Sequence, residues 1–166
     1  RLGRPAVRAA AHRAMRVMGG QFVLAEEIDA ALKRAGSGTA RRSRYSFDML
    51  GEGARTADDV QSYRQAYARA IARIGREAGN APLPARPGIS VKLSALHPRY
   101  TPLQEARVMA ELVPVVRDLA RDARAHDLNF TLDAEEAERL ELSLDVFAAV
   151  LADPALAGWD GFGLAI

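Results

Sequence analysis

A lysine and two aspartates occupy similar places in three short segments of alternating apolar and polar residues. Lys92 lies in GISVKLSALHPRY, Asp48 in YSFDML and Asp133 in NFTLDAE. Ser90 and Ser94 lie on the same side of their segment as Lys92, and a cation beside two hydroxyl groups indicates a cavity lined for a polar ligand. These residue types indicate a site for a small polar substrate, and Lys92 is its first candidate.

The alternation itself predicts strands at residues 45–50, 89–96, 129–135 and 162–166. Successive side chains of a strand point to opposite faces, so each predicted strand has one apolar face and one small or polar face. A strand buried on both faces of a parallel sheet is usually apolar throughout, so the polar face that carries Lys92 indicates a polar cavity. An edge strand whose Lys92 face meets water is the alternative.

Segments with apolar residues at three- and four-residue steps predict the amphipathic helices that would position these strands. Two helices, ending at Gly19-Gly20 and at Gly36, precede the first strand. A third follows a Thr56–Asp59 capping pair, and a fourth runs over residues 101–126 with an expected kink or split at Pro114. The last, over residues 136–151, is expected to bury Leu140, Leu144, Phe147 and Leu151.

Strands that alternate with helices of a dozen or more residues predict an α/β fold with right-handed crossovers and a parallel sheet. No GxGxxG follows a predicted strand, which removes support for a dinucleotide-binding Rossmann fold. A closed eight-stranded barrel takes about 250 residues. We therefore expect a helical lead-in over residues 1–43, and over residues 44–166 the first half of a TIM-type βα barrel with about four parallel strands.

In such a half barrel, Asp48, Lys92 and Asp133 would reach the carboxyl-terminal rim, where barrel enzymes carry their catalytic residues. One alternative is structural: Lys92 pairs with Asp133 or Asp48 only to hold the barrel mouth. Another is chemical: Lys92 forms a Schiff base with a carbonyl substrate, as in barrel aldolases. No two histidines are spaced for one metal, so no metal site is predicted, and His97 is interpreted as a loop residue.

The composition narrows the class of protein. The 166 residues include no cysteine, which excludes disulfides and thiol catalysis, and there is neither a signal-peptide pattern nor an apolar run of membrane-spanning length. We expect a cytoplasmic location and, since the first residue is not Met, an excised segment of a longer chain.

The first part of the chain is strongly basic. Residues 1–44 hold ten Lys or Arg against three Asp or Glu. A non-catalytic basic binding segment is thus a further alternative, although a solvated helix face explains the arginine spacing better.

Long motifs then point to a family. YSFDMLGEGA, GISVKLSALHPRY and TLDAEEAERLELSLDVF, followed by GWDGFGLAI, closely resemble the proline dehydrogenase domain of bifunctional bacterial proline utilization proteins. The likeness covers essentially the whole chain. It implies a distorted βα barrel that binds FAD and oxidises L-proline to 1-pyrroline-5-carboxylate, on the route of proline catabolism to glutamate.

The resemblance also implies roles for individual residues. Lys92 matches the lysine that meets the substrate carboxylate, Asp133 matches an aspartate between flavin and substrate, and Ala134 lies at the flavin. Asp48 and Met49 match residues that close the substrate pocket.

The same resemblance implies a gate and its loop. Glu52 matches a glutamate that pairs with an arginine of the last barrel helix, a helix beyond this sequence. Gly53 stands where the family leads us to expect alanine, a change expected to loosen the loop. Hydride transfer to a flavin needs no protein nucleophile, in agreement with the missing cysteine.

The resemblance also implies the partners of the full-length protein. They are L-proline as substrate, quinone as electron acceptor, peripheral contact with the inner membrane face and homo-oligomers of the full-length protein, with no nucleic acid bound through this segment. Alone, the segment is expected to be inactive, to hold FAD poorly and to aggregate through its open strand edges.

Overall fold

The computed structural model describes residues 3–38, 40–50 and 53–166. The chain divides into two compact units, one up to Ser43 and one from Arg44 onward. The first unit contains helix α1 (Arg4–Phe22), helix α2 (Ile28–Ala35) and a short 3-10 turn, η1 (Ala40–Arg42). None of the helices in the described residues is long and apolar enough to cross a membrane.

The first helix is longer than predicted, because Gly19 and Gly20 lie inside α1 and do not end it. Glycine costs a helix about 1 kcal/mol relative to alanine but does not forbid helical dihedral angles. The apolar side chains of α1 remain exposed within this unit, Phe22 most of all. In α2, Leu32 is buried and Gly36 follows the last turn as predicted, but the helix begins at Ile28 and leaves Leu24 outside.

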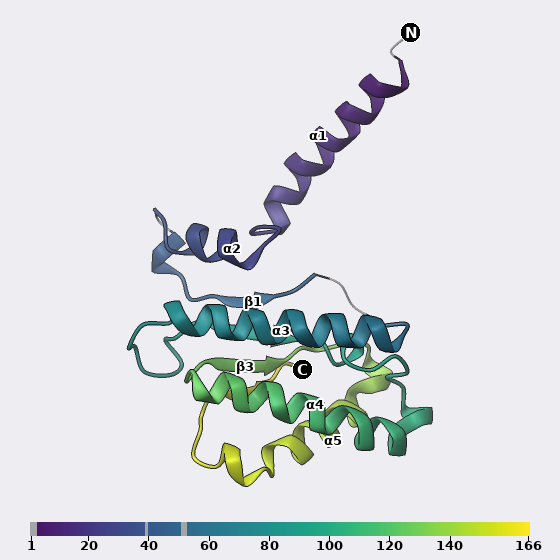
Figure 1. Cartoon of the computed structure of the whole chain (residues 1–166), viewed down its shortest axis with the longest axis vertical. Coiled ribbons are helices and arrows are strands. Elements are labelled where there is room, and N and C mark those ends of the chain that lie inside the picture. Colours follow the sequence, from purple (N-terminus) through teal and green to yellow (C-terminus); the bar gives the residue numbers. More distant parts are fainter. Residues whose placement is uncertain (1–2, 39, 51–52) are drawn as a thin grey trace. The chain divides into compact units, whose positions relative to one another are not determined.

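The second unit is a four-stranded parallel sheet with strand order β1-β2-β3-β4. The strands are β1 (Ser46–Asp48), β2 (Gly88–Val91), β3 (Asn129–Leu132) and β4 (Phe162–Leu164). Helices α3 (Ala57–Glu77), α4 (Glu105–Ala125) and α5 (Leu140–Leu151) connect them in turn (Figure 1). The predicted α/β class, the parallel sheet and the crossover helices are confirmed.

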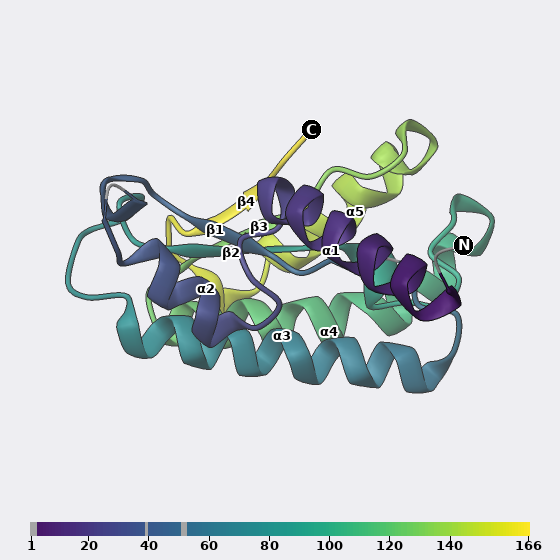
Figure 2. The same ribbon diagram turned by 90° about the horizontal axis from the view of Figure 1, so that it is seen from above.

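Helices α3 and α4 lie side by side along one face of this sheet (Figure 2). The alternation read from the sequence explains the packing: Ile89, Val91 and Phe130 are fully buried, whereas Ser90 and Thr131 are only half-buried. Such a division leaves one face of the sheet for the helices and the other for the inside of the partial barrel.

The start of α3 follows the sequence signal. The Thr56 side chain accepts a hydrogen bond from the Asp59 amide, and the Asp59 carboxylate accepts one from the Thr56 amide. This reciprocal capping box satisfies two amides that a helix otherwise leaves without partners. It confirms the predicted capping pair and fixes the end of the β1–α3 loop.

All four predicted strands are too long. The strands expected over residues 45–50 and 162–166 are observed only at Ser46–Asp48 and Phe162–Leu164. The strand expected over residues 89–96 ends at Val91, and residues Leu93–Ala95 form a 3-10 turn, η2. The strand expected over residues 129–135 ends at Leu132, the register partner of Val91. Alternation continues in the sequence beyond both ends, but strand length is set by pairing with neighbours, which alternation does not report. Lys92 and Asp133 are therefore the first residues after their strands.

Helix α4 runs continuously from Glu105 to Ala125 through Pro114, so the predicted split does not occur. It is preceded by a 3-10 turn, η3 (Pro102–Gln104). Proline removes one backbone donor, but tertiary packing can stabilise a helix against that loss. Here Leu112 and Val116 on either side of Pro114 are both fully buried.

The predicted buried face of the last helix is wrong. Helix α5 begins at Leu140, after the 3-10 turn η4 (Ala137–Arg139), and buries Leu142, Val146 and Val150 together with Ser143. Leu144 is 44% exposed and Leu140 and Leu151 are exposed as well, whereas Phe147 is half-buried and stacks on Phe162. The sequence LELSLDVFAAVL has apolar residues on both faces, so periodicity alone could not choose between them.

Candidate functional site

Lys92 is enclosed by two carboxylates at the carboxyl-terminal end of the sheet. Its Nζ lies 2.9 Å from Asp48 Oδ2 and also donates a hydrogen bond to Asp133 Oδ2. Asp48 is the last residue of β1, whereas Lys92 and Asp133 follow the last residues of β2 and β3. Parallel strands end at the same edge, so three residues far apart in sequence converge there as predicted.

Burial differs among the three groups. The side chain of Lys92 is 9% exposed, that of Asp133 27% and that of Asp48 41%. The ammonium is therefore nearly covered, while both carboxylates face outward in part. A ligand could therefore approach these three side chains from the side where Asp48 and Asp133 are exposed.

The charge of Lys92 is strongly favoured. Burial by itself would lower the pKa of Lys92, but hydrogen bonds to Asp133 and Asp48 and the charges of both carboxylates outweigh it and raise that pKa above its ordinary value. An ammonium has three N–H donors. Two are used by Asp48 and Asp133, and within residues 3–38, 40–50 and 53–166 no third acceptor contacts Nζ. One donor is thus left for an incoming anionic group.

The backbone of Lys92 is held from the helix side by Tyr67. The Lys92 amide donates to the Tyr67 hydroxyl oxygen at 3.2 Å, and Tyr67 is fully buried on α3. Burial raises the pKa of Tyr67 to about 12, so the phenol stays neutral. The spacing of apolar residues in the sequence gives no signal for the direction of the Tyr67 hydroxyl group.

Other predicted site residues lie at the same edge of the sheet. Met49 is half-buried directly after β1, and Ala134 is exposed directly after Asp133. Glu52, the predicted gate, lies outside the described residues. The roles assigned to these residues stay predictions.

Gly53 and Ala54 are hydrogen-bonded to Ser94, in the turn after β2. Gly53 has φ of +69°, a left-handed conformation that glycine adopts without steric cost. Its amide donates to Ser94 Oγ at 3.3 Å, and the next amide, that of Ala54, donates to the Ser94 carbonyl oxygen at 2.9 Å. These hydrogen bonds join Gly53 and Ala54 to the turn after β2, and the expected loosening of the loop stays a prediction.

Sequence reasoning also missed Glu135. Its side chain is 5% exposed, its Oε1 accepts the Ser94 amide at 2.9 Å, and its Oε2 lies 3.0 Å from Arg139 Nη1. The alternation had placed Glu135 and Ser94 on the polar faces of their segments, which was the only signal available. Their contact depends on the turns that follow β2 and β3, and those turns are set by tertiary packing.

His97 lies in the β2–α4 loop, as interpreted, but it is buried. Its Nδ1 accepts the Arg99 amide at 3.2 Å, and its Nε2 lies 3.3 Å from Glu111 Oε2. The first contact lies within the loop, and the second places His97 beside Glu111 of α4 without a hydrogen bond. Among the residues the structure describes, no group of three His, Asp or Glu is arranged to hold a metal ion.

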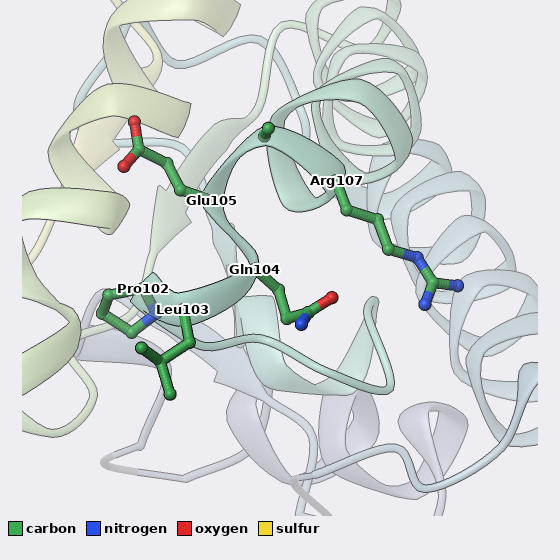
Figure 3. A pocket seen from close by; sticks show the side chains of 6 residues that line it. Pro102, Leu103, Gln104, Glu105 and Arg107 are labelled. Carbon is green, nitrogen blue, oxygen red and sulfur yellow. The ribbon is translucent and has the colours of Figure 1, made fainter.

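An open hollow lies at the start of α4, lined by residues Pro102 to Arg107 (Figure 3). The labelled side chains point in different directions and do not converge on one point. None of them is a predicted site residue, so the cluster around Lys92 remains the candidate site.

Known proteins match the chain along nearly its whole length. The bifunctional protein PutA of Klebsiella aerogenes is 48% identical over 164 residues, which are 99% of this chain and 12% of that protein. PutA of Rhizobium meliloti is 46% identical over 166 residues, covering all of this chain and 13% of that protein. The chain therefore spans only about an eighth of the length of these relatives.

Solved structures agree. A variant of proline utilization A from Bradyrhizobium japonicum matches with a TM-score of 0.80 and 67% identity, covering 99% of this chain and 17% of that one. Proline utilization A from Bdellovibrio bacteriovorus, inactivated by N-propargylglycine, has a TM-score of 0.85 over 95% of this chain and 18% of that one. At 21% identity this second likeness shows the fold alone. The family model for proline dehydrogenase matches residues 31–166, and the chain belongs to the proline dehydrogenase family.

Proposed function

We propose that this chain forms the substrate-facing first half of an FAD-dependent proline dehydrogenase barrel within a longer, bifunctional protein. The reaction is oxidation of L-proline to 1-pyrroline-5-carboxylate. The observation that carries the proposal is the buried Lys92 ammonium held between Asp48 and Asp133 at the carboxyl-terminal edge of the sheet. The family membership gives that arrangement its substrate.

Lys92 fits the role of carboxylate anchor. The proline carboxylate would take the ammonium donor that Asp48 and Asp133 leave over, and burial of Lys92 strengthens such a contact. Asp133 would accept from the proline amine and so orient the ring. Fixing the substrate at both polar ends holds the ring carbon beside the nitrogen in one place, which lowers the entropic part of the barrier.

The small side chain of Ala134 leaves space for a flavin ring beside Asp133. Ala134 is exposed and carries only a methyl group, so a flat ring can approach the backbone beside Asp133. When bound, FAD would supply the two-electron acceptor that oxidation of the proline ring requires. The chain's own contribution is to bind and orient proline through Lys92 and Asp133.

The same geometry disfavours the aldolase alternative. A Schiff-base lysine must lose its proton before it attacks a carbonyl group, and an active lysine has a lowered pKa. Two aspartates instead raise the pKa of Lys92. Borohydride reduction with a carbonyl substrate separates the two functions, because only an aldolase would retain a covalent adduct at Lys92.

The proposal also covers the location, the oligomeric state and the electron acceptor of the full-length protein. We place the full-length protein in the cytoplasm as a homo-oligomer that contacts the inner membrane face peripherally and passes electrons to quinone. Oxidation of proline-reduced protein by a soluble quinone analogue would support the acceptor. Sedimentation and flotation with vesicles would test the oligomer and the membrane contact.

The central experiment is anaerobic reduction of the purified full-length protein. L-Proline is expected to bleach the oxidised flavin absorbance, and D-proline, whose carboxylate cannot reach Lys92 with the ring in the same position, is expected to do so far more slowly. A protein that binds flavin but is not reduced by L-proline would contradict the proposal.

A further inference from the structure

We infer that Glu135 is a positioning residue for Lys92, acting through the backbone of Ser94. The inference rests on the proposed function for its effect on proline, but its structural part stands on the contacts alone. Glu135 is two residues beyond Asp133, and its side chain, 5% exposed, is even more buried than that of Lys92. A buried carboxylate is costly unless its oxygens are paired, so its partners indicate what it holds.

The two oxygens of Glu135 have different partners. Oε1 accepts the Ser94 amide at 2.9 Å, and Oε2 pairs with Arg139 Nη1 at 3.0 Å. The first contact crosses from the turn after β3 to the turn after β2. The second stays within its own segment, four residues along the chain. Only the first can transmit position to the lysine.

Ser94 lies two residues after Lys92, in the single 3-10 turn that ends β2. The Lys92 carbonyl oxygen accepts the Ala95 amide at 3.1 Å, so the backbone of this turn begins at the lysine itself. A shift of Ser94 would therefore move the Lys92 backbone. The amide of Lys92 is already fixed by Tyr67, and Glu135 supplies the restraint on the other side.

Ser94 also joins the third loop of the rim. Its carbonyl oxygen and Oγ accept the amides of Ala54 and Gly53, in the loop that follows Asp48. Glu135 thus fixes a serine that connects the turns carrying all three charged residues of the candidate site. A network of this kind holds side chains within the narrow tolerance that catalysis requires.

Two substitutions separate this role from a simple ion pair with Arg139. Glu135→Gln keeps an oxygen at full reach for the Ser94 amide but loses the charge. Glu135→Asp keeps the charge but is one methylene shorter and does not reach Ser94. Glu136→Ala is the matched control, because Glu136 Oε2 also lies 3.0 Å from Arg139 Nη1 yet makes no contact with Ser94.

In the full-length flavoprotein, Glu135→Asp is expected to raise KM for L-proline about tenfold with kcat changed less than about threefold, which is a loss of binding. Glu135→Gln and Glu136→Ala should stay within about threefold of wild type in both constants. A Gln variant impaired more than the Asp variant would assign Glu135 to its ion pair and overturn the inference, as would wild-type KM in both.

Hydrogen exchange keeps the test independent of activity. The Ser94 amide should exchange about tenfold faster in Glu135→Asp than in wild type, while amides in the middle of α3 stay unchanged. Unchanged exchange at Ser94 would overturn the inference. If wild-type protein does not oxidise proline, the proposed function fails, and the exchange of Ser94 still decides whether Glu135 holds the turn.

Discussion

Lys92 and Asp133 each stand one residue beyond the end of adjacent parallel strands, and their side chains meet in an ion pair. Val91 and Leu132, the residues before them, are register partners, so the pairing of the strands places the two charges level with each other. This arrangement combines a structural and a chemical role, since the same aspartate that fixes the lysine would face its substrate.

Replacing Lys92 by alanine should mainly weaken proline binding. The lost charge-assisted hydrogen bond is worth about 2–3 kcal/mol, so KM for L-proline should rise about 30-fold or more in the full-length protein. Lys33, the only other lysine of the chain, is exposed on α2, and Lys33→Ala is a matched control. Steady-state kinetics measure this KM, and an unchanged value in Lys92→Ala would show that Lys92 does not bind the proline carboxylate.

The two aspartates should differ in importance. Asp133 is the less exposed partner and is proposed to face the proline amine, so Asp133→Asn should lower kcat/KM at least about tenfold. Asp48 is 41% exposed and screened by water, so Asp48→Asn should cost about threefold or less. A larger loss of kcat/KM in Asp48→Asn than in Asp133→Asn would show that Asp48, and not Asp133, faces the proline amine.

Tyr67 should ionise only in strong alkali. Burial raises its pKa to about 12 in the folded state from 10.0, so the neutral phenol contributes stability below pH 10 that is lost as the pH rises toward 12. The loss is at most about 2–3 kcal/mol. The tyrosinate absorbance of wild type minus that of Tyr67→Phe should show this midpoint. A difference midpoint near 10 would mean that Tyr67 is hydrated and does not support the Lys92 amide.

The exposed and buried faces of α5 can be compared with one pair of substitutions. Leu142 is buried and Leu144 is exposed, two residues apart on the same helix. In the 166-residue chain, Leu142→Ala should destabilise the fold by about 2–4 kcal/mol, and Leu144→Ala by less than about 0.5 kcal/mol. Urea unfolding followed by circular dichroism, at protein concentrations low enough to limit pairing of the open strand edges, measures both. Equal losses in the free energy of unfolding would mean that Leu144 is buried, as the sequence predicted.

Much of the architecture could be predicted because it depends on local pattern. The alternation around Ile89 and Phe130 identified two strands and their apolar faces, and Thr56 with Asp59 identified the start of α3. The order of strands and helices then implied a parallel sheet, in which strand ends share an edge. Asp48, Lys92 and Asp133 could be expected at one edge for this reason, and long motifs supplied the family.

The rest was decided by tertiary structure. Where β2 ends depends on its pairing with β1 and β3, and which face of α5 is buried depends on the elements packed against it. Neither is encoded in the spacing of apolar residues within one segment. The contacts of Tyr67 with Lys92 and of Glu135 with Ser94 join residues 25 and 41 positions apart. A hydrogen bond across such a distance requires particular turns on both sides, and only the packed chain fixes those turns.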